Sequence, residues 1–218
     1  MKMKNTIIGL LVSVASVSLS HAATLITAFN AAGGSWAQQV LLSTGSPGTP
    51  YTAGQVMIGT FTTTTGLGSA SGPINLANYG WSELGATAFS ALAGDKGIFG
   101  TLGGTGVTGT LPTTVTGPFI GNDIFAVVAN PAGDNYIIWD SGIKFAVEQA
   151  GIGGAAVSFA TRDSTLVRGA LVPLGNTGLT GALAGQNGVG NAVTFVPESS
   201  TALLGALGGL LLLRRRRI

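Results

Sequence analysis

The clearest signal for the fold of this chain is GNDIFAVVANPAGDNYIIWDSG, residues 121–142. Within it, residues 124–129 are all apolar, a pattern typical of a strand that is buried on both faces. Turn-forming residues occupy 130–135, and the apolar segment 136–139 follows them. Two apolar segments separated by such a turn predict a β-hairpin, which we take as the centre of the fold.

Further strands are predicted on both sides of this hairpin. Residues 140–142 indicate a second turn, and the alternation of apolar and polar residues over 143–148 predicts a half-exposed strand after it. Other apolar segments bounded by turn formers predict strands at 24–30, 37–42, 55–61, 156–161, 165–171 and 192–196. Short strands without repeating βα units predict an all-β body, built as an antiparallel sandwich or jelly roll.

Two segments of the body differ from this pattern. Between Trp81 and Leu92 the apolar residues recur at helical spacing, which predicts one short helix in spite of Gly85. Segment 94–121 contains nine glycines and two prolines, and is predicted to be the loosest part of the body. It includes a Gly-x-Gly-x-x-Gly match at 104–109, but the Pro-containing sequence after it cannot form the helix that a dinucleotide site requires.

The N-terminal 22 residues resemble a secretory signal peptide in their layout. Lys2 and Lys4 make a short positive region, residues 7–17 are apolar, and small residues precede Ala23. This order predicts cleavage between Ala22 and Ala23, with signal peptidase and the export machinery as partners. The mature body is therefore expected to span 23–195.

The C-terminal segment 196–218 consists of three units in a fixed order. Val196, Pro197 and Glu198 come first, residues 201–213 are apolar, and the chain closes with four arginines before Ile218, namely Arg214, Arg215, Arg216 and Arg217. A proline-stiffened peptide suits recognition by an enzyme, and an apolar run followed by cations halts export with the cations on the cytoplasmic side. The apolar run is shorter than the ~20 residues of a straight spanning helix, but snorkelling arginines make a short transmembrane helix tolerable.

This tail resembles the PEP-CTERM sorting tails that exosortases recognise. The likeness rests on Val196, Pro197 and Glu198, and it departs from the family at Ser199, where a second proline is usual. The resemblance implies a bacterial protein that is anchored transiently in the inner membrane and cut by an exosortase-like enzyme. It also implies delivery to the cell surface or the extracellular matrix, where exopolysaccharide is a candidate partner.

Composition and charge exclude several classes of function for the body. Residues 23–195 contain four basic and seven acidic residues, so the net charge is −3 and the basic character of the whole chain belongs to its ends. No basic patch remains for a nucleic-acid partner. The body also has 32 of the 36 glycines and no cysteine, so its stability rests on packing without disulfides.

Catalytic machinery is largely absent from the sequence. The only histidine is His21, inside the predicted signal peptide, so no Ser-His-Asp or Cys-His arrangement and no His or Cys zinc site can form in the mature body. Carboxylates could still serve a glycosidase, and the candidates are Asp123, Asp134, Asp140, Glu148 and Asp163. Because most of them stand in turns, we predict no enzyme activity, no cofactor and no catalytic or metal-binding residue.

A binding module is the alternative to a surface or matrix component without catalytic activity. Asn122-Asp123 and Asp134-Asn135 could offer oxygen ligands to Ca²⁺, although such pairs more often form turns. Aromatic residues could stack on sugars, and the candidates are Trp36, Tyr51, Tyr79, Trp81, Tyr136 and Trp139. We expect Trp139 to be core, and Trp36 and Tyr79 to be the ones exposed for carbohydrate.

Overall fold

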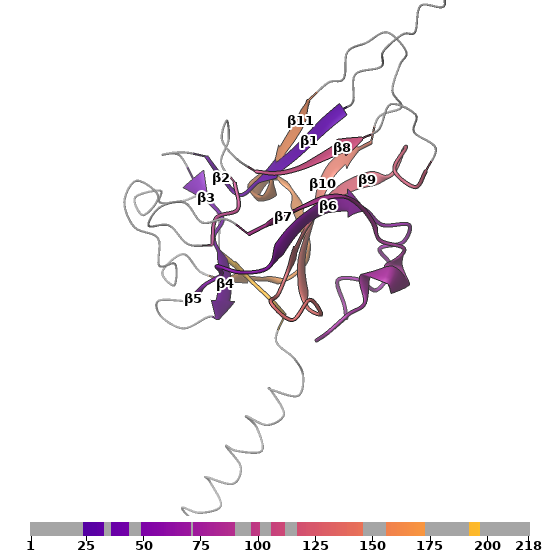
Figure 1. Cartoon of the computed structure of the whole chain (residues 1–218). Helices are drawn as coiled ribbons and strands as arrows, with labels where there is room; N and C mark the ends of the chain where they lie inside the picture. Colours follow the sequence, from indigo (N-terminus) through magenta and orange to yellow (C-terminus); the bar gives the residue numbers. More distant parts are fainter. Residues whose placement is uncertain are drawn as a thin grey trace, which may run out of the picture.

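The structure is a computed structural model that describes residues 24–32, 36–43, 49–70, 72–89, 97–100, 106–111, 117–145, 156–172 and 192–196. Over these ranges the chain is mostly β-strand (Figure 1). The elements are β1 (Thr24–Phe29), β2 (Ala31–Ala32), β3 (Trp36–Ala37), β4 (Val40–Ser43), β5 (Thr49–Pro50), β6 (Gln55–Thr60), η1 (Leu76–Tyr79), β7 (Ser82–Ala88), β8 (Val107–Leu111), β9 (Asp123–Ala129), β10 (Tyr136–Lys144), β11 (Val157–Ala160), η2 (Thr161–Asp163), β12 (Thr165–Arg168), β13 (Ala170–Val172) and β14 (Ala192–Thr194). The all-β prediction is confirmed for the described residues.

The predicted hairpin lies at the centre of the largest sheet. This sheet has the strand order β12-β10-β9-β6-β7 and is antiparallel throughout. In the hairpin Tyr136 pairs with Ala129 and Trp139 pairs with Ala126. The turn between the strands is closed by Asn130, whose backbone N–H donates to the Asn135 carbonyl at 2.8 Å. The hairpin prediction is therefore confirmed.

Two smaller sheets combine parallel and antiparallel pairs. One has the order β11-β1-β8, in which β1 is parallel to β11, and the other has the order β13-β14-β4-β5, in which β14 is parallel to β4. The prediction of an antiparallel arrangement is wrong for these two pairs. Each parallel pair joins a strand near the start of the body to one near its end. Such long-range pairing leaves no local sequence pattern.

The central sheet is buried on both faces along its inner strands β6 and β9, as the apolar segment 124–129 predicts. On the first face, side chains such as Val56, Ile124 and Val128 pack against Ile26, Val107 and Val193 from the two smaller sheets. Trp139 is fully buried in the same cluster, so its predicted place in the core is confirmed.

The second face of the central sheet is covered by a single connecting segment. Met57, Phe125, Val127 and Ile138 pack there against apolar side chains of segment 61–81, which connects β6 to β7 and includes η1. The members from this segment are Phe61, Leu67, Ile74, Leu76, Tyr79 and Trp81. In Figure 1 this purple segment lies to the right of the central strands, and β2 to β5 lie to the left.

The helix predicted between Trp81 and Leu92 is wrong as far as the structure describes this segment. Residues 82–88 form β7, which pairs antiparallel with β6 from Gln55↔Ala88 to Thr60↔Ser82. The glycine that weakened the helix prediction has a packing role in the strand, because a Cβ added at Gly85 would lie 2.4 Å from the Thr108 carbonyl oxygen of β8. This close approach requires glycine, and it places β7 against a strand that segment 94–121 was not predicted to contain.

Two predicted strand boundaries also need correction. β10 runs on through residues 140–144 with an irregular register in place of the expected turn and new strand. Gly142 has a positive φ of 68°, and the Asp140 carboxylate accepts from its N–H at 2.8 Å, so this turn signal makes a bulge inside one strand. The segment predicted as one strand at 165–171 is divided into β12 and β13 at Gly169, whose φ is 126°.

Candidate functional site at the start of the tail

The last described strand leads directly into the predicted sorting motif. β14 lies between β13 and β4, so it is an interior strand of its sheet. Phe195 follows it, is 8% exposed, and packs edge to face on Tyr51 with ring centroids 5.4 Å apart. Val196, the first residue of the motif, is half-buried, and its carbonyl accepts from Asn135 Nδ2 at 2.7 Å. The motif therefore begins on the folded body.

Asn135 connects this point to the rest of the fold. Its side chain is 5% exposed at the end of the hairpin turn, and its own N–H donates to Asn130 Oδ1 at 3.1 Å. Besides holding Val196, it accepts at Oδ1 from the Tyr136 N–H at 2.9 Å and from Arg168 Nη2 at 3.4 Å. Sequence reasoning treated this asparagine only as a turn former or calcium ligand. Its contact with Val196, 61 residues away, has no local signal.

Arg168 is a buried cation that sequence reasoning also missed. It is 1% exposed at the end of β12, and no described carboxylate forms an ion pair with it. Its guanidinium donates to the carbonyl oxygens of Leu67, Ala70 and Gly72, all in the segment that covers the second face of the central sheet. Burial lowers the pKa of this guanidinium, and the nearby Tyr79 opposes that effect. The sequence does contain one signal of this burial, because Arg168 is the only charged residue in the predicted strand 165–171.

Most of the residues predicted to be processed at the two ends of the chain lie outside the described residues. Ala22 and Ala23, the predicted cleavage residues, lie outside the described residues, as do Pro197, Glu198 and the arginines at 214–217. β1 begins at Thr24, one residue after the expected mature N-terminus, and lies between β11 and β8. No helix within the described ranges is long and apolar enough to cross a membrane.

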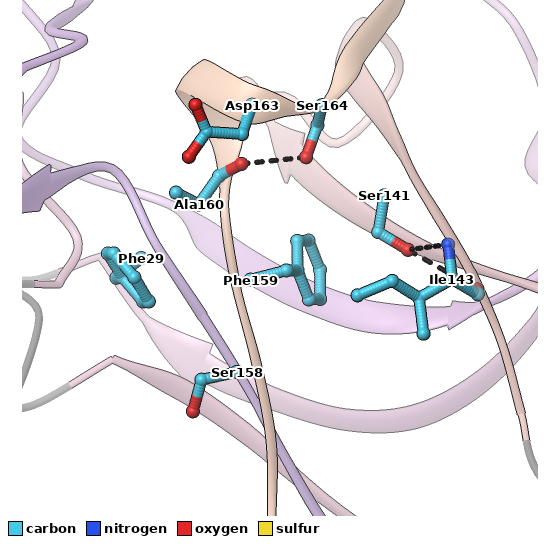
Figure 2. Close-up of a pocket in the computed structure, with 8 residues that line it drawn as sticks. All are labelled: Phe29, Ser141, Ile143, Ser158, Phe159, Ala160, Asp163 and Ser164. Carbon is cyan, nitrogen blue, oxygen red and sulfur yellow. Dashed lines mark hydrogen bonds between the residues drawn. The ribbon is translucent and has the colours of Figure 1, made fainter.

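A surface pocket of about 250 Å³ lies where β1, β10, β11 and η2 meet. In Figure 2 Phe159 stands between Phe29 and Ile143, with Asp163 and Ser164 beyond them. Three serine side chains and one carboxylate contribute to the lining, whose residues are Phe29, Ser141, Ile143, Ser158, Phe159, Ala160, Asp163 and Ser164. Phe29 and Phe159 are only 6% and 5% exposed, so their rings offer little face for stacking, and the exposed apolar surface belongs to Ile143.

Most polar groups of the pocket are already engaged by the protein. Ser164 Oγ donates to the Ala160 carbonyl at 2.7 Å, and Ser141 Oγ accepts from the Ile143 N–H at 3.1 Å. Asp163 Oδ1 accepts from Arg162 Nε at 3.1 Å, with the carboxylate largely exposed. The pocket could therefore bind a small hydroxylated molecule through Asp163 and Ser158.

The other described candidate carboxylates are held in turns or in an ion pair. Asp134 Oδ1 accepts from Asn130 Nδ2 at 2.9 Å, and Asp140 makes the bulge contact with Gly142. Asp123 lies 3.3 Å from Lys144 Nζ. Glu148 lies outside the described residues. These geometries match turn-forming and surface roles for the described candidates.

The two asparagine–aspartate pairs that were considered as possible calcium ligands do not meet. Asn122-Asp123 stands at the start of β9 and Asp134-Asn135 follows its far end, so the length of a strand separates them. Among the described residues no group of three or more His, Cys, Asp or Glu side chains is close enough to hold a metal ion. Their contacts within the protein are instead local turn bonds for Asn122 and Asp134, the ion pair with Lys144 for Asp123, and the bonds to Val196 and Arg168 for Asn135.

The aromatic candidates are mostly packed into the body. Tyr51 and Trp139 are buried, and Trp81 is half-buried against Phe61, with ring centroids 4.6 Å apart. Tyr79 and Tyr136 are half-buried at the edge of the second cluster. The predicted exposure of Tyr79 is thus only partial, and the side chain of Trp36 lies outside the described residues.

Comparisons with known proteins identify no relative of this chain. The sequence matches no family model, and neither the curated proteins nor the solved structures provide a match. The function therefore has to be argued from the residues of the chain itself.

Proposed function

We propose that this chain is an exported surface or extracellular-matrix protein without catalytic activity. In this proposal the tail anchors it transiently in the inner membrane, and an exosortase-like enzyme then cuts the tail. The observation that carries the proposal is the uninterrupted order of Val196-Pro197-Glu198, the apolar run 201–213 and the four arginines at 214–217. We further propose that the body is a β-sandwich, since the first face of its central sheet packs on the two smaller sheets.

The ends of the folded body support this order of events. β1 begins at Thr24 as an interior strand, so cleavage between Ala22 and Ala23 would leave it whole, whereas a cut a few residues later would shorten it. At the other end β14 is an interior strand whose next residues run into the motif. Both expected cleavages therefore fall outside the sheets, and the body can keep its packing after them.

The engaged carboxylates support a structural role for the body. Asp123, Asp134 and Asp140 each hold a neighbouring group, and these contacts suit a stable surface domain better than general acid–base chemistry. A net charge of −3 on the body fits a partner other than nucleic acid. Within the envelope, exopolysaccharide is the partner that this proposal assigns.

The experiment that tests the proposal is performed in a host that has an exosortase. Replacing Pro197 and Glu198 by alanine should stop cutting, so that full-size precursor accumulates in the membrane fraction. Replacing Arg214, Arg215, Arg216 and Arg217 by serine should release the chain from the membrane, because the apolar run loses its stop-transfer cations. Ser199→Pro should leave cutting unchanged or improve it. If the first two variants fractionate and migrate like the wild type, the tail is not a sorting signal.

The second candidate function is a carbohydrate- or calcium-binding module, and the pocket favours carbohydrate. A carboxylate and serine hydroxyls around Ile143 suit a small hydroxylated ligand, whereas the separation of the two asparagine–aspartate pairs argues against calcium. A glycan-array screen of the mature protein tests it. Asp163→Asn is expected to weaken the binding of any sugar that the array detects, and Asp134→Asn in the hairpin turn is the control outside the pocket. Equal signals from the two variants would rule out this pocket.

A further inference from the structure

We propose that Asn135 is a positioning residue that withholds Val196 from the processing enzyme, so that the tail is cut only when Val196 detaches from the body. The inference rests on the proposed function, because it concerns the same tail. It adds a control that the sorting motif alone does not contain: the folded body holds the first residue of its own cleavage motif.

The contacts around Val196 carry this inference. An enzyme that grips an extended peptide uses the main-chain groups of that peptide. The Val196 carbonyl is already bound to Asn135 Nδ2 at 2.7 Å, and the neighbouring Phe195 is buried against Tyr51. While this hydrogen bond exists, it occupies one of the two acceptor positions of the Val196 carbonyl and holds the residue on the body, away from an enzyme that must grip the peptide in extended form.

The length of chain beyond Val196 increases the effect. Four residues, 197–200, separate it from the apolar run, and at full extension they reach at most about 14 Å. With the apolar run in the bilayer, a body fixed at Val196 would stand close to the membrane surface, where the processing enzyme must also fit. Detachment of residues 195 and 196 would lengthen the accessible peptide at the point where the motif begins.

Asn135→Asp is the variant that tests this contact most selectively. The aspartate keeps the size of the side chain and the oxygen that accepts from Tyr136 N–H and Arg168. It replaces the donor Nδ2 by a second acceptor, which cannot bond the Val196 carbonyl. Loss of one buried hydrogen bond should raise the detached fraction about fivefold. Pulse-chase conversion of precursor to product should therefore be about fivefold faster while detachment limits the reaction.

A second variant supplies a free copy of the motif residue. Insertion of Gly-Ser-Gly-Ser-Val between Val196 and Pro197 leaves Val196 on Asn135 and places an unbound valine before the proline. This insertion alone should also speed cutting, and Asn135→Asp should add nothing to it. The charge-matched control is Asn75→Asp, which keeps the acceptor for the Ala77 N–H at η1 and changes an exposed side chain. It should be cut at the wild-type rate.

The outcomes separate this inference from the proposed function. If Asn135→Asp or the insertion is cut no faster than the wild type, while alanine at Pro197 and Glu198 still blocks cutting, the inference fails and the sorting tail stands. An equal acceleration by Asn135→Asp with and without the insertion would also overturn it, because the effect would not pass through Val196. If the alanine variant is cut normally, the proposed function itself fails.

Discussion

The two faces of the central sheet are buried by different means. The first face packs against two other sheets through aliphatic and aromatic side chains, with Trp139 fully buried among them. The second is covered by segment 61–81, which holds one short 3₁₀ helix and is tied down by the hydrogen bonds of Arg168. One face is thus closed by the packing of sheet on sheet, and the other by a connecting segment that a buried cation holds through hydrogen bonds. Mutations on the first face should therefore lower the stability of the whole body, whereas mutation of Arg168 should mainly loosen segment 61–81 and cost less free energy of unfolding.

Removal of the largest side chain from the first face should have the largest effect. Trp139→Ala leaves a cavity between the sheets, and large-to-small substitutions of this kind cost about 3–5 kcal/mol in the free energy of unfolding. Chemical denaturation measures this loss, followed by far-ultraviolet circular dichroism, which reports on the backbone and so does not depend on the tryptophan that is removed. A single cooperative transition at lower denaturant is expected. A loss below about 1 kcal/mol would mean that the first face is not the main core.

Arg168→Met should affect mainly the second face. Methionine keeps much of the volume but leaves buried carbonyls in segment 61–81 without their donor, for an expected loss of about 2–3 kcal/mol. The substitution should then speed hydrogen exchange more at the Ile74 amide than at the amides of β1. The Ile74 amide donates to the Asp134 carbonyl at 2.8 Å and so reports on the attachment of segment 61–81. Lys144→Met removes an exposed cation instead and serves as the control. Uniform acceleration at both places would contradict a separate second layer.

A smaller, pH-dependent effect should arise from Tyr51 on the first face. Burial raises the pKa of its hydroxyl to about 12, and this hydroxyl donates to the Ala129 carbonyl. Because the pKa is higher in the folded than in the unfolded chain, Tyr51 contributes stability below the unfolded value near 10 and loses it as pH rises through 12. A shift of this size corresponds to about 2–3 kcal/mol.

Comparison with Tyr51→Phe isolates this effect from other titrations. At pH 8 the wild type should be the more stable protein by about 1 kcal/mol, because the variant leaves the Ala129 carbonyl without its donor. Denaturation series at pH 8, 10 and 11.5 should show that this advantage shrinks or reverses at the highest pH. A constant difference at all three values would mean that Tyr51 is not buried as the structure has it.

The sequence predicted the first face better than the second. The continuous apolar segment 124–129 and the turn at 130–135 were sufficient for the hairpin, because both are local patterns. Segment 61–81 shows no regular pattern, so its role as a cover could not be seen. The apolar spacing from Trp81 to Leu92 fits a helix equally well, and it is the pairing of this segment with β6, together with the close approach of β8 at Gly85, that makes residues 82–88 a strand.

The candidate sites divide in the same way. The tail could be predicted because the order of motif, apolar run and arginines is itself a sequence pattern. The contact of Asn135 with Val196 and the position of Arg168 under segment 61–81 join residues that are 61 and about a hundred positions apart. Periodicity and turn chemistry contain no information on such pairs. They emerge only when β12, β14 and the hairpin turn are brought together by the fold.

The intact mass of the mature protein purified from its native host tests the central claim most directly. We expect a chain that begins at Ala23 and lacks the apolar run together with Arg214, Arg215, Arg216 and Arg217. That mass requires both cleavages, one on each side of the folded body. A protein that starts at Met1, or one that retains the arginines, would contradict the account of export and processing.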